Sequence, residues 1–331
     1  MAFGAILTVL AMEGAAAASL DAVELLNREV GAEVFASQMV QVNGRELHAV
    51  TGGHGELVLF VHGFPSFWYH FHDQMIDLVT DYQVVAIDAL GAGASEKPSE
   101  TDAYAISDLA AQLDGVASAF AGDEPFFIVG HDWGGALVLA FAEDRPDRLK
   151  GAVSLAAPPF TEMLKLLASS PEQRARSGYI ERFGDITYDD IVDGPVSETL
   201  FEISYRANID AGELSTEEGR LFERAITDPD ALYAGMNWYR ANFPSFDKID
   251  EDATWPSADV QLNVPALIIW GENDPVFVPE TWQSLGKKGP DVAIEAIAGS
   301  RHWLTFEDPS EVNAALRRFF ERRKKAEPSR N

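Results

Sequence analysis

Near the middle of the chain, a glycine-framed turn joins two apolar runs. Residues 125–129, Pro-Phe-Phe-Ile-Val, predict a fully buried strand, and residues 136–142, Ala-Leu-Val-Leu-Ala-Phe-Ala, predict a helix. The turn between them, residues 130–135, is Gly-His-Asp-Trp-Gly-Gly. Glycines in such a turn permit a strained backbone, which lifts the central side chain into a pocket beside the helix N-terminus. The sequence therefore predicts a strand, a tight turn and a helix that together raise the carboxylate of Asp132.

The raised carboxylate has two interpretations. Asp is a good helix N-cap, and the hexapeptide taken alone is more often a cap than a reactive group. A reactive Asp132 needs partners at the ends of other strands. Residues 264–270 predict a buried strand, and the turn that follows, residues 271–275, is Gly-Glu-Asn-Asp-Pro, with two carboxylates. A further short strand over 294–297 precedes the segment that contains His302.

The order of these groups along the chain is a further signal. Asp132 comes first, the acidic turn second and His302 last, which is the order of nucleophile, acid and histidine in the α/β-hydrolase triad. Upstream, residues 57–61 predict a strand that leads into His-Gly-Phe-Pro at 62–65, where that fold supplies an N–H donor for an oxyanion. Each motif is weak by itself. In this order and at the ends of predicted strands, they indicate a catalytic site.

With these motifs, the sequence resembles the α/β-hydrolase superfamily. Within it, the chain is similar to the epoxide hydrolases, in the aspartate-nucleophile branch that they share with the haloalkane dehalogenases. The resemblance extends from about Ser37 to Phe320 and includes Gly-Met-Asn-Trp-Tyr-Arg at 235–240 and Gly-Ser-Arg-His-Trp at 299–303. It implies an α/β class protein with the α/β-hydrolase fold, a mostly parallel eight-stranded sheet flanked by helices, with an inserted helical cap.

The patterns along the chain divide it into five segments. Between Pro158 and about Asp250, polar and amphipathic helical patterns replace the strands, as expected of an inserted cap. The predicted segments are an N-terminal extension (1–35), a first part of the hydrolase core (36–157), the helical cap (158–250), a second part of the core (251–325) and a tail (326–331).

The N-terminal extension gives conflicting signals. Residues 15–19, Ala-Ala-Ala-Ala-Ser, resemble a signal-peptidase region, which would imply a periplasmic or secreted protein. However, no Lys or Arg precedes the apolar run 2–12, and Glu13 interrupts it. We therefore expect a cytoplasmic protein, in which residues 21–30 form an amphipathic helix outside the core.

The resemblance implies the roles of three residues. Asp132 is the expected nucleophile, His302 the base and Asp274 the acid that orients it. Asp274 is preferred to Glu272 because the acid of the family lies at the Asp274 position of this turn. Some relatives carry the acid after the sixth strand instead, but residues 153–159 contain no acidic side chain.

A carboxylate nucleophile changes the reaction. Its attack on an ester or amide would give a high-energy anhydride, so Asp132 suits displacement at a saturated carbon, which makes an alkyl ester of the enzyme. Water activated by His302 then attacks the carbonyl carbon of that ester, while Asp274 fixes the imidazole tautomer. The backbone N–H groups of Phe64 and Trp133 are the expected oxyanion hole, and each contributes on the order of 3 kcal/mol in related sites.

The leaving group sets the substrate class. An epoxide leaves as a basic alkoxide and needs a proton donor, and Tyr239, in the 235–240 motif, resembles the donor of the epoxide hydrolases. A phenol pKa of about 10 suits this role. Tyr179 is the candidate for a second donor, although Tyr188, Tyr205 and Tyr233 remain open. The sequence thus predicts an epoxide hydrolase, a hydrolase acting on ether bonds that makes a vicinal diol.

Two other functions compete with this prediction. A haloalkane dehalogenase would use the same Asp, His and Asp triad, and the indole of Trp133 would suit a halide. The second halide donor in that group is often an Asn, however, where this chain has Phe64. A non-catalytic ligand-binding protein with this fold typically lacks a member of the triad. For the epoxide hydrolase, Trp68 and Trp238 are expected to line an apolar substrate pocket.

Composition excludes several partners. The net charge of −28, from 25 basic and 53 acidic residues, argues against nucleic acid and anionic membranes. The absence of cysteine removes disulfides and thiolate metal sites, and no His, Asp or Glu cluster has ligand spacing. We expect no cofactor, no bound metal and no membrane span. The expected partners are a small apolar epoxide and water, with a homo-oligomer left open.

Overall fold

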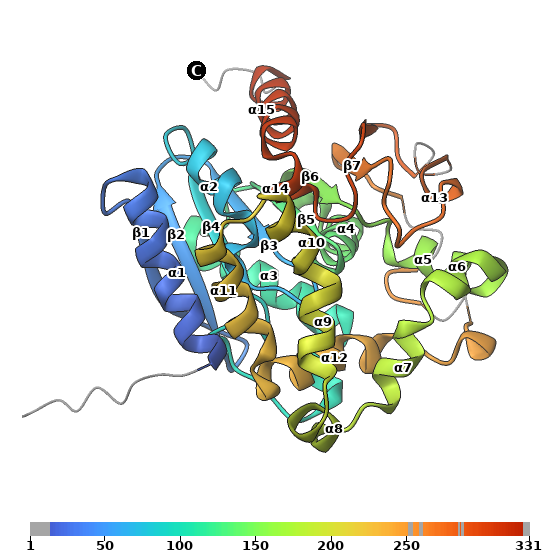
Figure 1. The fold of residues 1–331 in the computed structure, drawn as a ribbon. Coiled ribbons are helices and arrows are strands. Elements are labelled where there is room, and N and C mark those ends of the chain that lie inside the picture. The colour runs from blue at the N-terminus through green and yellow to red at the C-terminus, as the bar shows by residue number, and fades with distance from the viewer. Residues whose placement is uncertain (1–13, 251–253, 258–260, 284, 286–287, 327–331) are drawn as a thin grey trace, which may run out of the picture.

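Eight strands form one sheet through the centre of the structure (Figure 1), a computed structural model that describes residues 14–250, 254–257, 261–283, 285 and 288–326. The strand order is β1-β2-β4-β3-β5-β6-β7-β8. β1 and β2 pair antiparallel, as do β2 and β4, whereas every other pair is parallel. The predicted mostly parallel, eight-stranded sheet is confirmed. The strands are β1 (Phe35–Val42), β2 (Arg45–Gly53), β3 (Leu57–Val61), β4 (Gln83–Asp88), β5 (Phe126–His131), β6 (Leu149–Leu155), β7 (Ala266–Gly271) and β8 (Val292–Ile297).

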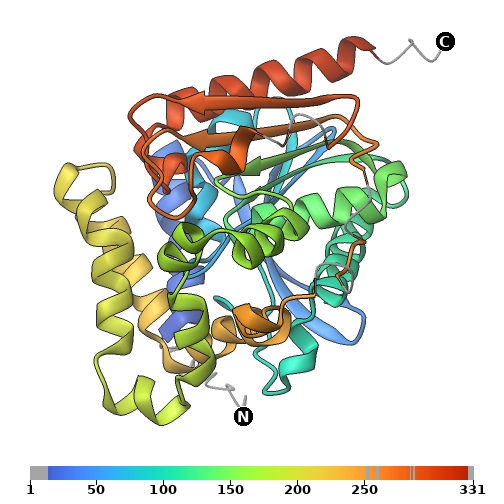
Figure 2. The same cartoon turned by 90° about the vertical axis from the view of Figure 1, so that its right-hand side faces the viewer.

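Alternating side chains of the strands fill two core layers, one on each face of the sheet. Along β3, Leu57 and Leu59 belong to one hydrophobic cluster, while Val58 and Phe60 belong to the other. The central strands are apolar on both faces because helices cover both (Figure 2). The first layer lies under α3 (Ile106–Ala121) and α4 (Trp133–Asp144), and the second under α1 (Gly14–Val30), α2 (His72–Leu78) and α15 (Pro309–Ala326).

Between β6 and β7, the described residues form helices and no strand. This helical segment, here called the cap, covers the edge of the sheet where the parallel strands end. Its elements are α5 (Phe160–Ser169), α6 (Pro171–Arg176), α7 (Tyr179–Asp185), α8 (Tyr188–Asp193), α9 (Val196–Phe201), a π-helical turn (Glu202–Arg206), α10 (Ala207–Ala211), α11 (Thr216–Thr227), α12 (Pro229–Asn242) and η5 (Phe246–Lys248). Short helices elsewhere are η1 (Trp68–Phe71), η2 (Thr101–Tyr104), η3 (Pro146–Arg148), α13 (Glu280–Gln283) and α14 (Leu304–Glu307).

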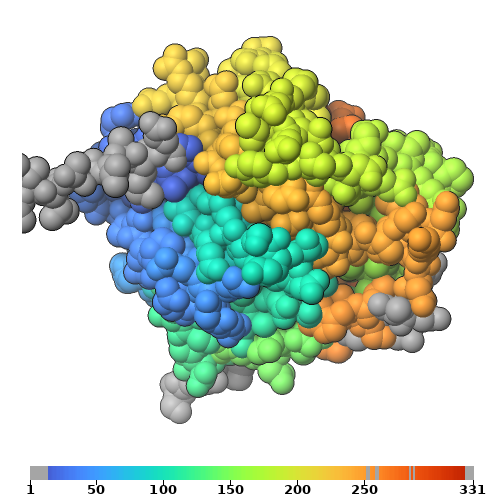
Figure 3. All heavy atoms as spheres, turned by 90° about the horizontal axis from the view of Figure 1, so that it is seen from below, coloured from blue at the N-terminus to red at the C-terminus, as the bar shows by residue number. Residues whose placement is uncertain are grey.

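Helix α1 corrects one expectation from the sequence. The helix begins at Gly14 rather than at residue 21, and it lies inside the second core layer rather than outside the core. Ala18 and Ala22 are fully buried, and these small side chains let α1 pack closely against α11 of the cap. The surface of the molecule shows the same contact, since the blue N-terminal helix adjoins the yellow cap helices (Figure 3).

The N-terminal signal-like segment lies partly outside the described residues, which begin at residue 14. Residues 15–19 form the first turns of α1, where the Ser19 hydroxyl donates a 2.5 Å hydrogen bond to the buried Asp88 carboxylate. Within the part of the chain that the structure describes, no helix has both the length and the apolar character required to cross a bilayer.

Candidate active site

Asp132 occupies the turn between β5 and α4, with φ 52° and ψ −122°. A positive φ is unfavourable for a residue with a Cβ, so the surrounding structure must hold Asp132 in this conformation. Its side chain makes no capping hydrogen bond to α4. The helix-cap interpretation of Asp132 is therefore wrong, and its carboxylate is free to face the site.

Two glycines make the turn possible. A Cβ on Gly130 would lie 2.1 Å from the carbonyl oxygen of Gly134, and a Cβ on Gly134 would lie 2.0 Å from that of Val61. Both distances are far inside van der Waals contact. The glycines are therefore required by the close approach of the turn to its own helix and to β3.

His302 and Asp274 meet Asp132 at the edge of the sheet. The Nδ1 atom of His302 lies 2.9 Å from Oδ2 of Asp274, and its Nε2 atom lies 3.6 Å from Oδ2 of Asp132. The other oxygen of Asp274 accepts a hydrogen bond of 2.7 Å from the backbone N–H of Val276. Glu272 is exposed, so only Asp274 of the two carboxylates in this turn contacts the histidine.

The charges of this group shift one another's pKa. Burial disfavours the charged imidazolium, but the nearby carboxylates of Asp274 and Asp132 outweigh burial and raise the pKa of His302 to about 10. Burial likewise disfavours the charged form of Asp132, but the hydrogen bond and positive charge of His302 lower the pKa of Asp132 overall. These two shifts favour a charged imidazolium beside an ionised Asp132 in the resting site.

His131, beside Asp132, contacts the backbone of His302. Its Nε2 atom lies 2.8 Å from the backbone carbonyl oxygen of His302 and must donate, because a carbonyl can only accept. Burial is the largest cause that lowers the pKa of His131, to about 4. The neutral ring thus holds the backbone of His302, a contact that was not predicted from the sequence.

A backbone N–H donor faces Oδ1 of Asp132, the carboxylate oxygen other than the one near His302. The backbone N–H of Phe64 donates to Oδ1 of Asp132 at 2.9 Å. The preceding His62 stabilises this loop, because its Nε2 accepts from the Ala89 N–H at 3.1 Å while Nδ1 donates to the Gly63 carbonyl at 2.7 Å. Trp133 is the first residue of α4, where backbone N–H groups have no partner within the helix.

Tyr179 and Tyr239 come together opposite Asp132. Their ring centroids are 6.0 Å apart, and both side chains line the same cavity as Asp132. Burial, followed by the charge of Asp132, raises the pKa of Tyr179. Burial, followed by the neighbouring Tyr179, raises the pKa of Tyr239 well above its usual value. Both phenols therefore keep their protons at neutral pH.

The three competing tyrosines lie elsewhere. The Tyr205 hydroxyl donates to the carbonyl oxygen of Pro65 at 2.5 Å, and the Tyr188 hydroxyl donates to Asp230 at the surface. The ring of Tyr233 lies under the guanidinium of Arg240. Of the five cap tyrosines, only Tyr179 and Tyr239 line the cavity that holds Asp132.

A cavity of about 640 Å³ lies between the cap and the edge of the sheet, and it contains Asp132 and His302. Its walls are mostly apolar. The face of α9, the π-helical turn and α10 forms one wall, which was not predicted from the sequence because the π-helical turn takes its polar members off the regular helical spacing. These polar members are Thr199, Ser204 and Asn208.

Trp68 does not line this cavity, contrary to expectation. Its side chain is fully buried under α1, and its indole N–H donates to the backbone oxygen of Ser19 at 3.0 Å. The aromatic residue type suggested a pocket, but the tertiary contact with α1 places the ring in the second core layer.

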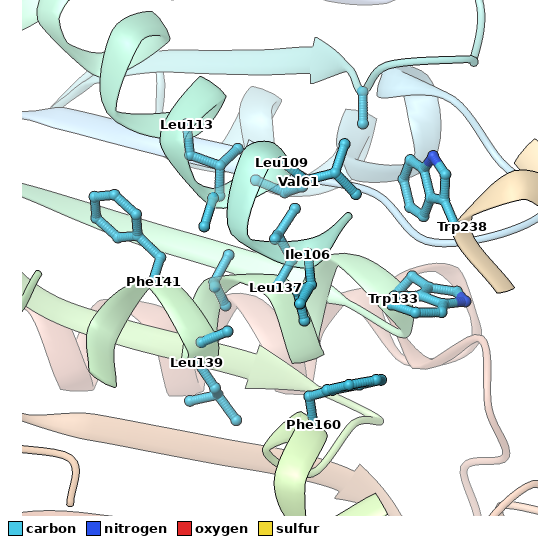
Figure 4. Packing of buried hydrophobic residues seen from close by; sticks show 14 of the residues in the cluster. Val61, Ile106, Leu109, Leu113, Trp133, Leu137, Leu139, Phe141, Phe160 and Trp238 are labelled. Atoms are coloured by element: carbon cyan, nitrogen blue, oxygen red, sulfur yellow. The ribbon is translucent and has the colours of Figure 1, made fainter. Parts of the chain in front are cut away.

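Trp238 is also removed from the cavity. Its indole N–H donates to the backbone oxygen of Leu90 at 2.8 Å, and its ring packs on Trp133 with 6.0 Å between centroids. Figure 4 shows Trp133 between Trp238 and Phe160. Trp238 therefore packs against Trp133 outside this cavity, and the structure does not place it at the expected substrate contact. Among the described residues, no group of three His, Cys, Asp or Glu side chains is arranged to hold a metal ion.

The sheet order, the cap and the strained acidic turn define a hydrolase-fold protein with aspartate at the nucleophile position. Residues 56–309 match the model of the alpha/beta hydrolase fold family. An AB hydrolase superfamily protein of Bacillus subtilis, YfhM, is 30% identical over 285 residues, covering 84% of this chain and 96% of its own. Epoxide hydrolase 3 of Xenopus tropicalis is 30% identical over 292 residues, covering 84% of this chain and 75% of its own.

Solved structures agree with the sequence relatives. An epoxide hydrolase from Bacillus megaterium, in complex with an inhibitor, matches with a TM-score of 0.79 and 26% identity, covering 86% of this chain and 100% of that one. Epoxide hydrolase A from Mycobacterium thermoresistibile matches with a TM-score of 0.74 and 28% identity, covering 87% and 98%. The chain belongs to the α/β-hydrolase superfamily and, within it, to the epoxide hydrolase family.

Proposed function

We propose that the protein opens epoxides to vicinal diols through a covalent ester on Asp132. One observation carries the proposal: the carboxylate of Asp132 and the phenols of Tyr179 and Tyr239 line one apolar cavity. A nucleophile and protonated donors thus line the same space, as ring opening of an epoxide requires. The epoxide hydrolases among the relatives support the same reaction.

In the first step, Oδ2 of Asp132 attacks one carbon of the epoxide. A bond forms between Oδ2 and that carbon, the bond from the carbon to the epoxide oxygen breaks, and the oxygen takes a proton from Tyr239 or Tyr179. Their raised pKa values keep them protonated for this donation. The Phe64 N–H, 2.9 Å from Oδ1, orients the carboxylate for attack.

In the second step, Nε2 of His302 takes a proton from water, and the resulting hydroxide attacks the side-chain carbonyl carbon of Asp132. Oδ1 becomes the oxyanion, which the N–H groups of Phe64 and Trp133 stabilise. Asp274 holds the imidazole through Nδ1 and stabilises its charged form. The bond from the carbonyl carbon to Oδ2 then breaks, and Oδ2 takes the proton from the His302 imidazolium, so the diol leaves with Oδ2. The enzyme keeps the oxygen of the water, and the proton of the new carboxylic acid restores the phenol that donated in the first step.

The fate of the water oxygen tests this scheme. After a single turnover of styrene oxide in water labelled with a heavy oxygen isotope, the label should appear in the peptide that contains Asp132 and not in the diol. Later turnovers should transfer the label to the diol. Label in the diol after the first turnover would mean direct attack of water on the epoxide and would rule out the ester.

The dehalogenase alternative finds less support. The indole N–H of Trp238, which would be needed to replace the missing second halide donor, already donates to the Leu90 carbonyl oxygen. Phe64 has an apolar side chain at the position where such a donor is often found. Parallel turnover of a bromoalkane and an epoxide separates the two activities, and an Asp132 adduct with either would exclude a protein that only binds ligands.

The remaining features of this function are also proposed. The expected substrates are an apolar epoxide and water, without a resident cofactor, in a cytoplasmic protein. The burial of Ala15, Ala18 and Ser19 in the core supports this compartment, because removal of those residues would expose the second core layer. Fractionation of the native cells would test it.

A further inference from the structure

Two cavities of very different size meet at the reacting groups. The cavity of about 640 Å³ described above and a second one of about 40 Å³ are both lined by Asp132, Tyr179 and Tyr239. An epoxide held between the carboxylate and the phenols has two carbons, each with its own substituents. The two cavities are therefore the spaces available to the substituents on the two carbons.

The smaller cavity is too small for an aromatic ring. An internal cavity of about 150 Å³ accommodates benzene. At about 40 Å³, the small cavity holds hydrogen or a small alkyl group, whereas the large cavity accepts a bulky group with room to spare.

The walls of the small cavity resist enlargement. Trp133, Phe160 and Phe243 pack on one another with centroid distances between 5.2 and 5.8 Å. Rings that pack in this way on three sides have no free volume into which they can rotate. Met163, on α5, also lines this cavity, and its flexible side chain is the part of the wall that can move most easily.

We propose that the substrates are terminal epoxides, or epoxides with at most a small alkyl group on the second carbon, whose single bulky substituent lies in the large cavity. The size difference between the two cavities, rather than the total volume of the site, excludes epoxides with bulky groups on both carbons. This inference rests on the proposed epoxide hydrolase function and names its substrate class.

Relative rates on matched epoxides test the inference. Styrene oxide has one phenyl group, and trans-stilbene oxide has one on each carbon. The ratio of kcat/KM for styrene oxide over trans-stilbene oxide should be about a hundredfold or more, because even one methylene in a tight pocket is worth about 10–200-fold. A ratio near one would overturn the inference while leaving the epoxide hydrolase function intact. No turnover of either would overturn both.

Two matched variants assign the selectivity to the small cavity. Met163→Ala enlarges it, and the ratio of kcat/KM for trans-stilbene oxide over styrene oxide should rise about tenfold or more. Ile203→Ala enlarges only the large cavity, where Ile203 is 72% exposed, and should leave the ratio unchanged. A ratio that responds to Ile203→Ala and not to Met163→Ala would overturn the assignment. Phe160→Leu provides a second enlargement if Met163→Ala does not fold.

Discussion

Asp132 and His302 each control the ionisation of the other. In the resting site, the pKa of His302 is raised to about 10 because two carboxylates outweigh its burial. Alkylation converts Asp132 into a neutral ester and removes one of these carboxylates, so the pKa of His302 must fall when the ester forms. The lower pKa lets His302 lose its proton, and the neutral imidazole can then act as the base that the proposed hydrolysis of the ester needs.

This change predicts a pH dependence of the ester intermediate. Formation of the ester needs ionised Asp132, whose lowered pKa keeps that step constant over the range from about pH 5 to pH 8. Hydrolysis needs neutral His302 and therefore slows as the pH falls through its pKa in the ester. The fraction of enzyme present as ester at steady state, measured by acid quench and intact mass, should rise at low pH. An ester fraction that rises toward high pH would contradict this order of steps.

The proposed role of the two phenols as proton donors leads to a second prediction. Tyr239→Phe removes one proton donor and should slow ester formation from styrene oxide by about a hundredfold, since general acid catalysis contributes about 10²–10⁴-fold and Tyr179 remains. Stopped-flow or quenched single turnover measures this step. Tyr233→Phe, outside the cavity and under Arg240, is the matched control and should leave the rate unchanged. An unchanged rate in Tyr239→Phe would remove Tyr239 from the donor role.

Among the helices and strands, the π-helical turn Glu202–Arg206 links the cap to the core loop that contains Phe64 and Pro65. A π-helical turn inserts an extra residue in a helix and often occurs at functional sites. Here it carries Tyr205, fully buried, whose hydroxyl bonds to the carbonyl of Pro65. Pro65 follows Phe64, the residue whose N–H contacts Asp132. One cap element thus positions the donor of a core loop.

This link predicts a selective defect in Tyr205→Phe. Without the hydroxyl, the Phe64 N–H is less firmly held, and ester hydrolysis should slow by about tenfold, a fraction of the 10²–10³ that loss of a whole oxyanion donor costs. Ester formation should change less, so that the ester accumulates in intact mass spectra. Tyr104→Phe removes a comparable buried bond, 2.8 Å to the Pro98 carbonyl, and should not cause accumulation. Equal slowing of both steps would point to a general structural defect instead.

The sequence predicted the elements around Asp132 better than it predicted the cap. The strand over 57–61 is β3 without change, and the helix over 136–142 lies within α4, because local periodicity and glycine spacing specify both. The wall formed by α9 and α10 was not predicted. Which side of those helices faces the cavity depends on the π-helical turn, and no local pattern in the sequence marks that turn.

For the whole molecule, helix α1 joins the cap to the core. It packs against α11, and Ala15 of α1 donates its backbone N–H to Asp228 at the start of α12. Exposed ion pairs, such as Arg28 with Glu217, contribute little to such a contact. The burial of Ala18 and Ala22 is the larger contribution.

A bulky side chain at this contact should therefore destabilise the protein. Ala22→Leu adds volume to a fully buried position and should reduce the free energy of unfolding by about 1–3 kcal/mol. Leu20→Ala, at an exposed position of the same helix, should change it by less than about 0.5 kcal/mol. Urea unfolding followed by circular dichroism measures both. Equal effects would mean that α1 is not closely packed.

Long-range contacts also explain why Trp68 was misassigned. Its residue type suited a pocket, but its indole bonds to Ser19, which is 49 residues earlier in the chain. A contact across that separation depends on the position of α1, which the sequence suggested lay outside the core. The positions of the catalytic candidates at strand ends could be predicted, because the sheet brings the ends of its parallel strands together.

The packing of α1 against the cap limits how freely this cap can be exchanged between relatives. Leu221, Phe222 and Ile226 of α11 are buried in the same cluster as α1. A chimera that grafts the cap alone onto another hydrolase core would leave these side chains facing water, with aggregation as the expected outcome. The smallest transplantable module is therefore the cap together with residues 14–30, two pieces that are separated by more than a hundred residues in the chain but share one interface.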